Sequence, residues 1–315
     1  MAKVRIRHWL VKATVQKTVS FIPGGWYLNA FLQQHFTHSL ELGEAQFELR
    51  VAQGRKHLES LFSAERGCKS DFSVFELGTG WHPIIPVGMY LCGASRVTTA
   101  DIHPLLTHER VLRTIRLYLS LAERETLVTI LPWARPERIG ILLQLAKCAN
   151  NTRMCNLLRA MEIYPIVEDA GRIEYLPSPP DFLFSNSTLQ YISAVDLNSI
   201  FKNLRKLANS KAVMSHHIYL GYDLASFDPF ISPYHFLRFS RATWKLIDSP
   251  IHSHNRLRLS DYLKIHEANG WKINNEDTVS GSLEDLRRVP LAEEFRKCSD
   301  RDLLPLRTWL VSSAA

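Results

Sequence analysis

One stretch, residues 72–104, constrains the fold more than any other part of the chain. It begins with a short apolar run, Phe72–Leu77, whose aromatic and branched residues predict a buried strand. The segment Gly78–Gly80 follows at once, and its two glycines allow a tight turn and the close approach of a ligand. A helix is expected to begin near Pro86, because proline suits a first helical position, and to end near Gly93.

A second predicted strand, residues 96–100, follows this helix and leads into Asp101. The order strand, glycine turn, helix, strand and acidic residue is typical of the βαβ unit of a nucleoside-binding site. In such units a carboxylate about 20 residues past the glycines accepts hydrogen bonds from two ribose hydroxyls. The stretch therefore predicts an α/β fold that holds a nucleoside at Asp101.

The residues around the turn indicate which nucleoside fits. A dinucleotide site has the pattern G-x-G-x-x-G, because the pyrophosphate lies at the helix N-terminus and the third glycine allows close packing. Here the positions up to and including that of the third glycine are filled by Trp81, His82 and Pro83. Glu76 lies two residues before the first glycine, where its carboxylate would repel a pyrophosphate but attract an amino group or a sulfonium.

This arrangement resembles the first motif of class I S-adenosylmethionine-dependent methyltransferases, with Asp101 in the place of their ribose-binding acid. The resemblance extends over about residues 70–312 and implies a doubly wound, seven-stranded, mostly parallel sheet of the Rossmann-like type. It also implies S-adenosylmethionine as the cofactor. The cofactor-binding residues expected from it are Glu76, Gly78, Thr79, Gly80, Asp101, Ile102, Asp169, Asn186 and Ser187.

Two later segments supply the last three of those residues. Residues 162–169 are expected to form the third strand, and its final Asp169 is where the family commonly holds the adenine amino group; a solvated turn acid would explain this residue equally well. Residues 181–187 predict a fourth strand that opens at Asn186 and Ser187 onto the ligand, at the carboxyl end of the sheet. Gln190 and Tyr191 follow one turn later, and Tyr191 is a candidate acceptor-binding residue.

A fifth strand is predicted for residues 211–219, with His216 and His217 near its end. Neighbouring residues of a strand face opposite sides, so only one of the two can point at a given site. A histidine is well suited to deprotonate a hydroxyl before methyl transfer, which makes either residue a candidate base. A structural role for both is the alternative. No metal site is predicted, because these histidines have no carboxylate or cysteine at ligand spacing.

The irregular, aromatic and His-rich residues 221–258 follow the fifth strand, where many small-molecule methyltransferases carry an acceptor-binding excursion. Arg256 and Arg258 are expected to clamp the acceptor, and an aromatic frame with forked donors suits a sugar or another polyol. A surface loop with aromatic anchors is the alternative. Residues 122–160 are longer than a simple crossover and predict an insertion of one or two helices. Residues 306–312 predict a final antiparallel strand.

The first 70 residues are expected to form a helical cap on a methyltransferase domain of residues 71–315. Five of the seven excess positive charges lie within residues 1–40, which contain no acidic residue. Within residues 3–22, Val11, Val15 and Val19 fall at helical spacing among basic residues. This pattern indicates either an interfacial helix on an anionic membrane or acidic partner, or a helix packed on the domain with its basic edge in water. An organelle presequence is a further alternative.

Other features bound the class of protein. Five scattered cysteines without C-x-x-C spacing predict a reduced, cytoplasmic protein, and the chain has no run of 18 apolar residues, so no membrane-spanning helix is expected. In the helical pattern of residues 26–65, the residues Trp26, Tyr27 and Asn29 are candidates for a lid. A nucleic acid is an improbable substrate, because the basic excess lies at one terminus and Asn186 does not begin an Asn-Pro-Pro-Tyr motif.

The sequence thus predicts a methyltransferase that acts on an oxygen of a small polar acceptor such as a sugar or other hydroxylated metabolite, with a nitrogen as the alternative atom. Two other functions remain open. One is an NAD(P)-dependent oxidoreductase. The other is a non-catalytic Rossmann-like scaffold that docks through its basic N-terminus. Nothing in the sequence indicates the oligomeric state.

Overall fold

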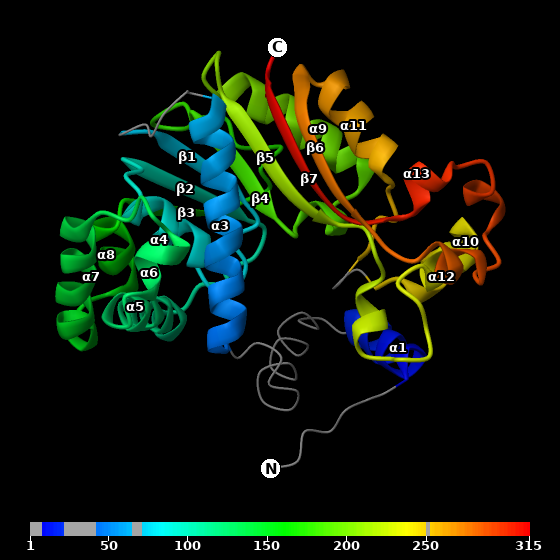
Figure 1. The fold of residues 1–315 in the computed structure, drawn as a ribbon, viewed down its shortest axis with the longest axis horizontal. Coiled ribbons are helices and arrows are strands. Elements are labelled where there is room, and N and C mark those ends of the chain that lie inside the picture. The colour runs from blue at the N-terminus through cyan, green and yellow to red at the C-terminus, as the bar shows by residue number, and fades with distance from the viewer. Residues whose placement is uncertain (1–7, 22–41, 65–70, 250–252) are drawn as a thin grey trace.

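A single sheet organises the residues that the computed structural model describes, namely 8–21, 42–64, 71–249 and 253–315. Its seven strands lie in the order β3-β2-β1-β4-β5-β7-β6 (Figure 1). They are β1 (Ser73–Leu77), β2 (Arg96–Asp101), β3 (Ile163–Val167), β4 (Phe182–Asn186), β5 (Val213–Tyr219), β6 (Trp271–Ser280) and β7 (Pro305–Ala314). β7 is antiparallel to both β5 and β6, and all other neighbouring strands are parallel. The expected mostly parallel α/β fold is confirmed.

Helices cover both faces of this sheet. Val74 of β1 and Phe184 of β4 pack on one face, whereas Phe75 and Leu183 pack on the other, because successive strand residues alternate. Central strands buried on both faces need nearly continuous apolar runs, as residues 72–77 and 182–184 have. The first face carries α3 (Glu44–Ala64), α4 (Ile84–Leu91), α5 (His108–Glu123), α6 (Thr126–Ile130), α7 (Pro136–Cys148) and α8 (Met154–Ala160). The second face carries α9 (Ala194–Leu207) and α11 (Leu259–Ala268).

Prolines explain two differences from the predicted helices. α4 begins at Ile84 rather than near Pro86, and the proline lies in the first turn, where its missing N–H costs no hydrogen bond. The insertion at residues 122–160 contains three helices, α6 to α8, and a 3₁₀ turn η1 (Ala149–Asn151), rather than one or two helices. Pro132 follows the end of α6 and Pro136 begins α7, so the segment is divided where a continuous helix would clash.

A third hydrophobic cluster lies beyond the sheet, on the right of Figure 1. It unites the excursion after β5 with the segment between β6 and β7, through buried residues such as Tyr234, Phe236 and Phe295. The aromatic frame of residues 221–258 is therefore largely a core. The elements of this cluster are α1 (Trp9–Ser20), η3 (Asp223–Ser226), η4 (His235–Arg238), α10 (Arg241–Ile247), α12 (Leu283–Arg287), η5 (Glu293–Phe295) and α13 (Asp300–Leu303).

The two described N-terminal helices occupy different places. α3 runs along the first face of the sheet, against α4, β4 and β5. α1 instead packs on the third cluster through Ala13, as the interpretation of a domain-packed helix expected. The lid candidates Trp26, Tyr27 and Asn29 lie outside the described residues. In the described parts of the chain, every helix is too short or too polar to traverse a lipid bilayer.

Candidate functional site

The glycine turn after β1 is fixed to the end of β2. Gly78 and Gly80 have φ angles of +82° and +68°, which glycine adopts without the strain of a side chain. The Gly78 N–H donates to the Ala100 carbonyl at 2.8 Å. A Cβ atom on Gly78 would lie 2.3 Å from the Thr188 side chain, so a side chain there would collide with the loop after β4. The turn, the end of β2 and the start of the loop after β4 therefore form one unit.

Asp101 ends β2 with its carboxylate already oriented. The Gly80 N–H donates to Oδ2 at 3.0 Å, and the His103 N–H donates to Oδ1 at 3.0 Å. Each carboxylate oxygen can accept a further hydrogen bond, so the group remains able to bind a pair of hydroxyls. The next residue, Ile102, is 65% exposed and offers an apolar surface beside this carboxylate. The structure thus brings Asp101, followed by Ile102, to the glycine turn.

Glu76 is a buried carboxylic group with an unused acceptor. It is 3% exposed at the penultimate position of β1, and no described residue forms a hydrogen bond with its Oε2 atom. Burial, and after it the neighbouring Asp101 carboxylate, raises the pKa of Glu76 well above its ordinary value, while Thr79 and Arg50 act in the opposite direction. Leaving such an acceptor unpaired costs free energy, about 1–3 kcal/mol for a neutral group.

At the same edge of the sheet, further buried polar atoms have no hydrogen-bond partner in the described parts of the chain. They are the hydroxyl of Thr79 in the glycine turn and the side-chain carbonyls Asn186 Oδ1 and Gln190 Oε1 after β4. Gln190 belongs to the 3₁₀ turn η2 (Leu189–Tyr191). Like Glu76, these groups can all accept hydrogen bonds. The edge is accordingly prepared for a ligand rich in N–H and O–H donors.

Helix α3 contributes a row of polar residues that the sequence analysis did not single out. Arg50 donates to Gln53 Oε1 at 3.2 Å, and Asn186 donates to the same oxygen at 2.9 Å. His57 lies 2.9 Å from the Ser215 hydroxyl through its Nδ1. The spacing of three and four residues puts all of them on one side of the helix, over the ends of β4 and β5. Polar residues at that spacing usually face water, which is why the pattern alone does not reveal them.

Arg50 is the cation of this row. Its burial lowers the pKa of the guanidinium, and the nearby Tyr191 and Glu76 raise it again. Within the described residues Gln53 is the only hydrogen-bond partner of Arg50, although a guanidinium offers five N–H donors. The group therefore has donors left for an anion.

The two neighbouring histidines of β5 face opposite sides of the sheet. His217 lies on the α3 side, with Nδ1 3.1 Å from the Ser187 hydroxyl and its ring 4.8 Å from that of Trp309. Burial, and then the positive charges of Arg50, Arg307 and Lys56, lower the pKa of His217 to about 4. The imidazole is hence neutral at pH 7. The Ser187 backbone N–H donates to the His217 carbonyl at 2.8 Å, which joins the ends of β4 and β5.

His216 lies apart from this site, so of the two candidate bases only His217 faces it. It lies on the other face, where its Nδ1 is 2.7 Å from the Ser185 hydroxyl. Its ring stacks on Phe201 of α9 at 5.3 Å and meets His266 of α11 at 5.5 Å. It is 1% exposed, and burial lowers its pKa well below the ordinary value. His216 is therefore part of the core.

Arg256 and Arg258, the two predicted acceptor clamps, instead bond to other residues of the protein. Arg258 is 1% exposed and donates to the carbonyls of Leu220, Leu303 and Pro305 at 2.8–3.3 Å. Arg256 is 7% exposed and donates to the Phe239 carbonyl at 2.6 Å and to Glu294 at 2.5 Å. Both guanidiniums stabilise the third cluster, because they donate hydrogen bonds to buried backbone carbonyls that would otherwise have no donor.

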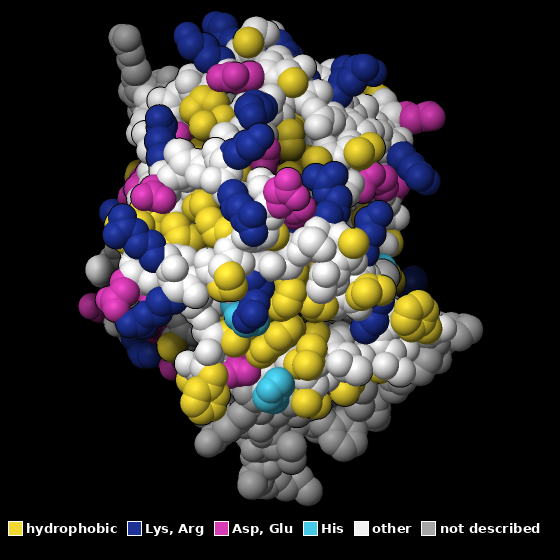
Figure 2. All heavy atoms as spheres, turned by 90° about the vertical axis from the view of Figure 1, so that its right-hand side faces the viewer, with side chains coloured by type: hydrophobic (Ala, Val, Ile, Leu, Met, Phe, Trp, Pro, Cys, Tyr) yellow, Lys and Arg dark blue, Asp and Glu magenta, His cyan; other side chains and the backbone are white. Residues whose placement is uncertain are grey.

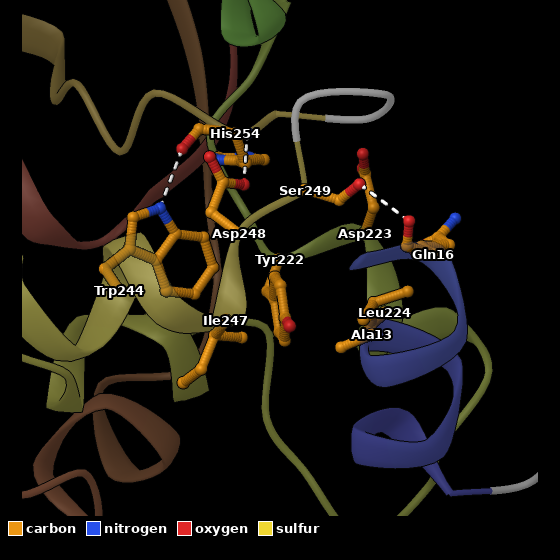
Figure 3. A pocket seen from close by; sticks show the side chains of 10 residues that line it. All are labelled: Ala13, Gln16, Tyr222, Asp223, Leu224, Trp244, Ile247, Asp248, Ser249 and His254. Atoms are coloured by element: carbon orange, nitrogen blue, oxygen red, sulfur yellow. Dashed lines mark hydrogen bonds between the residues drawn. The ribbon is translucent and has the colours of Figure 1, made fainter. Parts of the chain in front are cut away.

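Tyr191 connects the sheet edge to the third cluster. Its hydroxyl donates to Asp223 Oδ2 at 2.7 Å, and burial followed by Asp223 raises the pKa of the phenol. Asp223 also lines a small pocket between α1 and α10 (Figure 3). On one side of that pocket lie Ala13 and Gln16 of α1, and on the other Trp244 and Ile247 of α10.

Asp169 lies two residues beyond β3, apart from the groups above. Its Oδ1 accepts the Gly171 N–H at 2.9 Å, and its side chain is 38% exposed. Because β3 is separated from β1 by β2, Asp169 is farther along the carboxyl edge than Asp101. Its role at an adenine ring stays a prediction.

No protein-family model matches the chain, and no characterised protein matches it by sequence. Solved structures that resemble it share little sequence. A SAM-dependent methyltransferase from Methanosarcina mazei is 12% identical, with 78% of this chain and 93% of that chain covered and a TM-score of 0.43.

Two further solved structures are comparably distant. Magnesium protoporphyrin IX methyltransferase from Synechocystis, solved with bound SAH, is 12% identical, with 87% and 89% of the two chains covered and a TM-score of 0.42. The YcgJ protein from Bacillus subtilis is 10% identical, with 81% and 97% covered and a TM-score of 0.40. At this distance the activity of the chain follows only from its own residues.

Proposed function

We propose that the chain is an S-adenosylmethionine-dependent methyltransferase that methylates an oxygen of a small, hydroxylated acceptor. The observation that carries this proposal is the carboxyl group of Glu76, buried and with an unused acceptor beside the glycine turn. It occurs together with Asp101, held at the end of the next strand by two backbone amides. A ligand that offers an ammonium group near the turn and hydroxyls at Asp101 satisfies both carboxylates.

The same observation argues against a nicotinamide dinucleotide. A pyrophosphate at the turn would lie beside the buried carboxyl group of Glu76, and a second anion there would be unfavourable. The sequence also has Trp81–Pro83 where a dinucleotide site needs its third glycine. An oxidoreductase is consequently the weaker explanation.

The cofactor would be held by residues of the first face. Asp101 would accept from its ribose hydroxyls, Glu76 would meet its ammonium group, and Arg50 supplies the positive charge for its carboxylate. Ile102 and Asp169 are proposed for the adenine. Gly78, Thr79 and Gly80 line the turn, and Asn186 and Ser187 close the site from β4. When bound, S-adenosylmethionine supplies an electrophilic methyl group.

His217 is the proposed base. With Nδ1 at the Ser187 hydroxyl, its second nitrogen, Nε2, makes no hydrogen bond to another described residue. A base whose pKa is about 4 is too weak to ionise an alcohol in advance. It can take the proton as the oxygen gains its methyl group, because the hydroxyl becomes strongly acidic at that stage. Positioning of the acceptor in line with the methyl group then supplies much of the rate.

The acceptor would lie between His217 and Tyr191, which come from β5 and η2. Tyr191, held by Asp223, is proposed to orient it, together with Asn186 and Ser187. These are hydroxyl, amide and imidazole groups, which suit hydrogen bonding to a sugar or another polyol. Arg256 and Arg258 bond within the third cluster and are not part of this proposed acceptor site.

A thermal-shift comparison tests the proposed function. S-adenosylhomocysteine is expected to raise the midpoint of unfolding in a concentration-dependent way, because a ligand that binds only the folded state stabilises it. NADH and NADPH are expected to leave it unchanged. Stabilisation by a nicotinamide cofactor alone would establish the oxidoreductase alternative. Stabilisation by neither would favour the non-catalytic scaffold.

A further inference from the structure

Helix α1 exposes several large apolar side chains. Its buried positions are Ala13, Gln16 and Val19, one of which is polar. Its outward side, with the residue that follows the helix, carries four large apolar residues that are 43–75% exposed: Leu10, Val11, Val15 and Phe21. A helix that packs on a soluble domain ordinarily shows the opposite arrangement, with the apolar stripe toward the core.

Polar contacts from both ends fix this orientation. At the start of α1, the Trp9 N–H donates to the Asp228 carboxylate at 3.0 Å. Near its end, the Lys17 ammonium donates to the Asp248 carbonyl at 2.6 Å, and the Ser249 hydroxyl donates to the Gln16 carbonyl at 3.1 Å. These partners lie more than 200 residues away in sequence, so the folded third cluster itself holds the apolar stripe outward.

Neighbouring elements extend the exposed apolar surface. Lys12 places its ammonium 3.0 Å from the centre of the Phe227 ring, and Lys17 reaches the carbonyl of Lys245, the residue before Leu246. Figure 2 shows hydrophobic side chains gathered in the lower half of the face that contains this cluster. We call the set the α1 face; it consists of Leu10, Val11, Val15, Phe21, Phe227, Phe230 and Leu246, all at least 43% exposed. Exposed apolar groups gathered in this way mark an interaction surface.

The charges around the α1 face are positive. α1 itself has Lys12 and Lys17 and no acidic residue, and Arg238, Arg241 and Lys245 are exposed on the adjoining segments. The two aspartates that contact the ends of α1 are engaged inside the protein. Asp228 accepts from the Trp9 and Phe230 N–H groups, and Asp248 accepts from the His254 N–H and the Ser253 hydroxyl.

We propose that the α1 face docks on the surface of an anionic lipid bilayer, with α1 lying in the plane of the interface. An uncharged apolar stripe flanked by lysines, with no carboxylate on the helix, has the composition of helices that bind in this way. A lipid surface needs only apolar burial and positive charge. It therefore fits a stripe of Leu, Val and Phe better than a protein partner that would require matching polar groups.

The position of the face relative to the candidate site follows from the pocket in Figure 3. Ala13 and Gln16, on the inward side of α1, line this pocket together with Asp223. Asp223 in turn accepts the hydrogen bond of Tyr191. A docked protein would thus have its third cluster, with the Tyr191–Asp223 pair, between the bilayer and the sheet.

Vesicle co-sedimentation of the full chain tests the proposal without reference to activity. Binding is expected to vesicles of phosphatidylcholine mixed with phosphatidylglycerol, and to weaken as salt screens the charges. The double variant Val11→Ser/Val15→Ser, on the outward side of α1, is expected to lower the partition coefficient about tenfold. Leu246→Ser, on a different element, is expected to lower it as well. The matched control is Val195→Ser, which is 79% exposed in the wild type but lies on α9, and its binding should be unchanged.

Three results would overturn the proposal. The first is that the wild type does not sediment with anionic vesicles. The second is that all these variants bind as the wild type does. The third is a concentration-dependent self-association, seen by sedimentation velocity, that Val11→Ser/Val15→Ser abolishes; this would assign the α1 face to a second copy of the chain.

Discussion

Arg50 of α3 and Glu76 of β1 lie close enough for each charge to favour the other, yet the two side chains form no ion pair. Burial dominates at both residues, since it lowers the pKa of Arg50 and raises that of Glu76. Glu76 Oε2 has no partner, and Arg50 bonds only to Gln53 among the described residues. A zwitterion placed between them would satisfy both groups, and this is the charge pattern of an α-amino acid.

The first prediction concerns Glu76→Gln in the protein without ligand. The pKa of Glu76 is higher in the folded state than in the unfolded chain. The folded state is therefore destabilised as the pH rises above the pKa of the unfolded chain, because the unfolded chain releases its proton first. The variant is therefore expected to be more stable than the wild type at pH 8 and equal to it near pH 4, by urea unfolding. Its affinity for S-adenosylhomocysteine should fall by about 1.5–3 kcal/mol, the value of a hydrogen bond to a charged group.

The matched control for this experiment is Glu123→Gln, at an exposed position of α5. It should alter neither quantity. A Glu76→Gln variant that is less stable at pH 8 and binds the ligand normally would show that the buried carboxylate serves the fold.

The second prediction concerns His217 and acid. Its folded pKa of about 4 lies below the unfolded value, so its contribution to stability is complete above pH 6.5 and is lost as the pH falls toward 4. Between pH 7 and pH 5 the wild type should lose about 2 kcal/mol more than His217→Gln, from the difference between the two pKa values. Urea unfolding at the two pH values measures this. His8→Gln, at an exposed position, should behave as the wild type; equal losses in all three proteins would contradict the assignment.

The third prediction separates the two glycines of the turn. Gly78→Ala introduces a Cβ 2.3 Å from Thr188 at a positive φ, whereas Gly80→Ala meets nothing within 4 Å and has only the positive φ to accommodate. Gly80→Ala is expected to cost about 1–2 kcal/mol of unfolding free energy, and Gly78→Ala clearly more. Gly140→Ala in α7, with open space around it, should stabilise by about 0.5–1 kcal/mol. Equal costs at Gly78 and Gly80 would refute the described contact with Thr188.

The fourth prediction distinguishes a structural Arg258 from an acceptor clamp. Arg258→Met leaves the Leu220, Leu303 and Pro305 carbonyls without their donor, and is expected to destabilise the fold by about 3–5 kcal/mol. Arg172→Met, whose side chain is 81% exposed in the wild type, should change stability by less than about 0.5 kcal/mol. If Arg258→Met is as stable as the wild type, Arg258 becomes a candidate acceptor ligand again.

The sequence predicted the central part of the fold because that part depends on local patterns. The apolar run before Gly78, the glycines and the acid at Asp101 each have one simple structural requirement, and all three lie within 30 residues. The alternation of side chains along a strand also correctly predicted that only one of His216 and His217 faces a given site. It could not tell which, because that depends on the face that α3 covers.

The residues that sequence reasoning missed or misplaced depend on contacts between distant segments. The charge of Arg50 acts on Glu76 only because α3 packs along β4 and β5. Arg258 is a residue type suited to clamping a ligand, but two segments, one after β5 and one at the start of β7, direct carbonyls at its guanidinium. The valines of α1 share a helical spacing, yet Val11 and Val15 face outward while Val19 is buried, since the polar contacts at the helix ends set its rotation.

Calorimetric titration of S-adenosylhomocysteine into the wild type and Asp101→Ala tests the central claim most directly. Saturable binding to the wild type is expected, with a loss of about 1–3 kcal/mol in the variant, because charge-assisted hydrogen bonds to the ribose disappear. Asp300→Ala, at an exposed position near α13, should bind as the wild type does. The absence of binding to the wild type, or an affinity that Asp101→Ala leaves unchanged, would contradict the account.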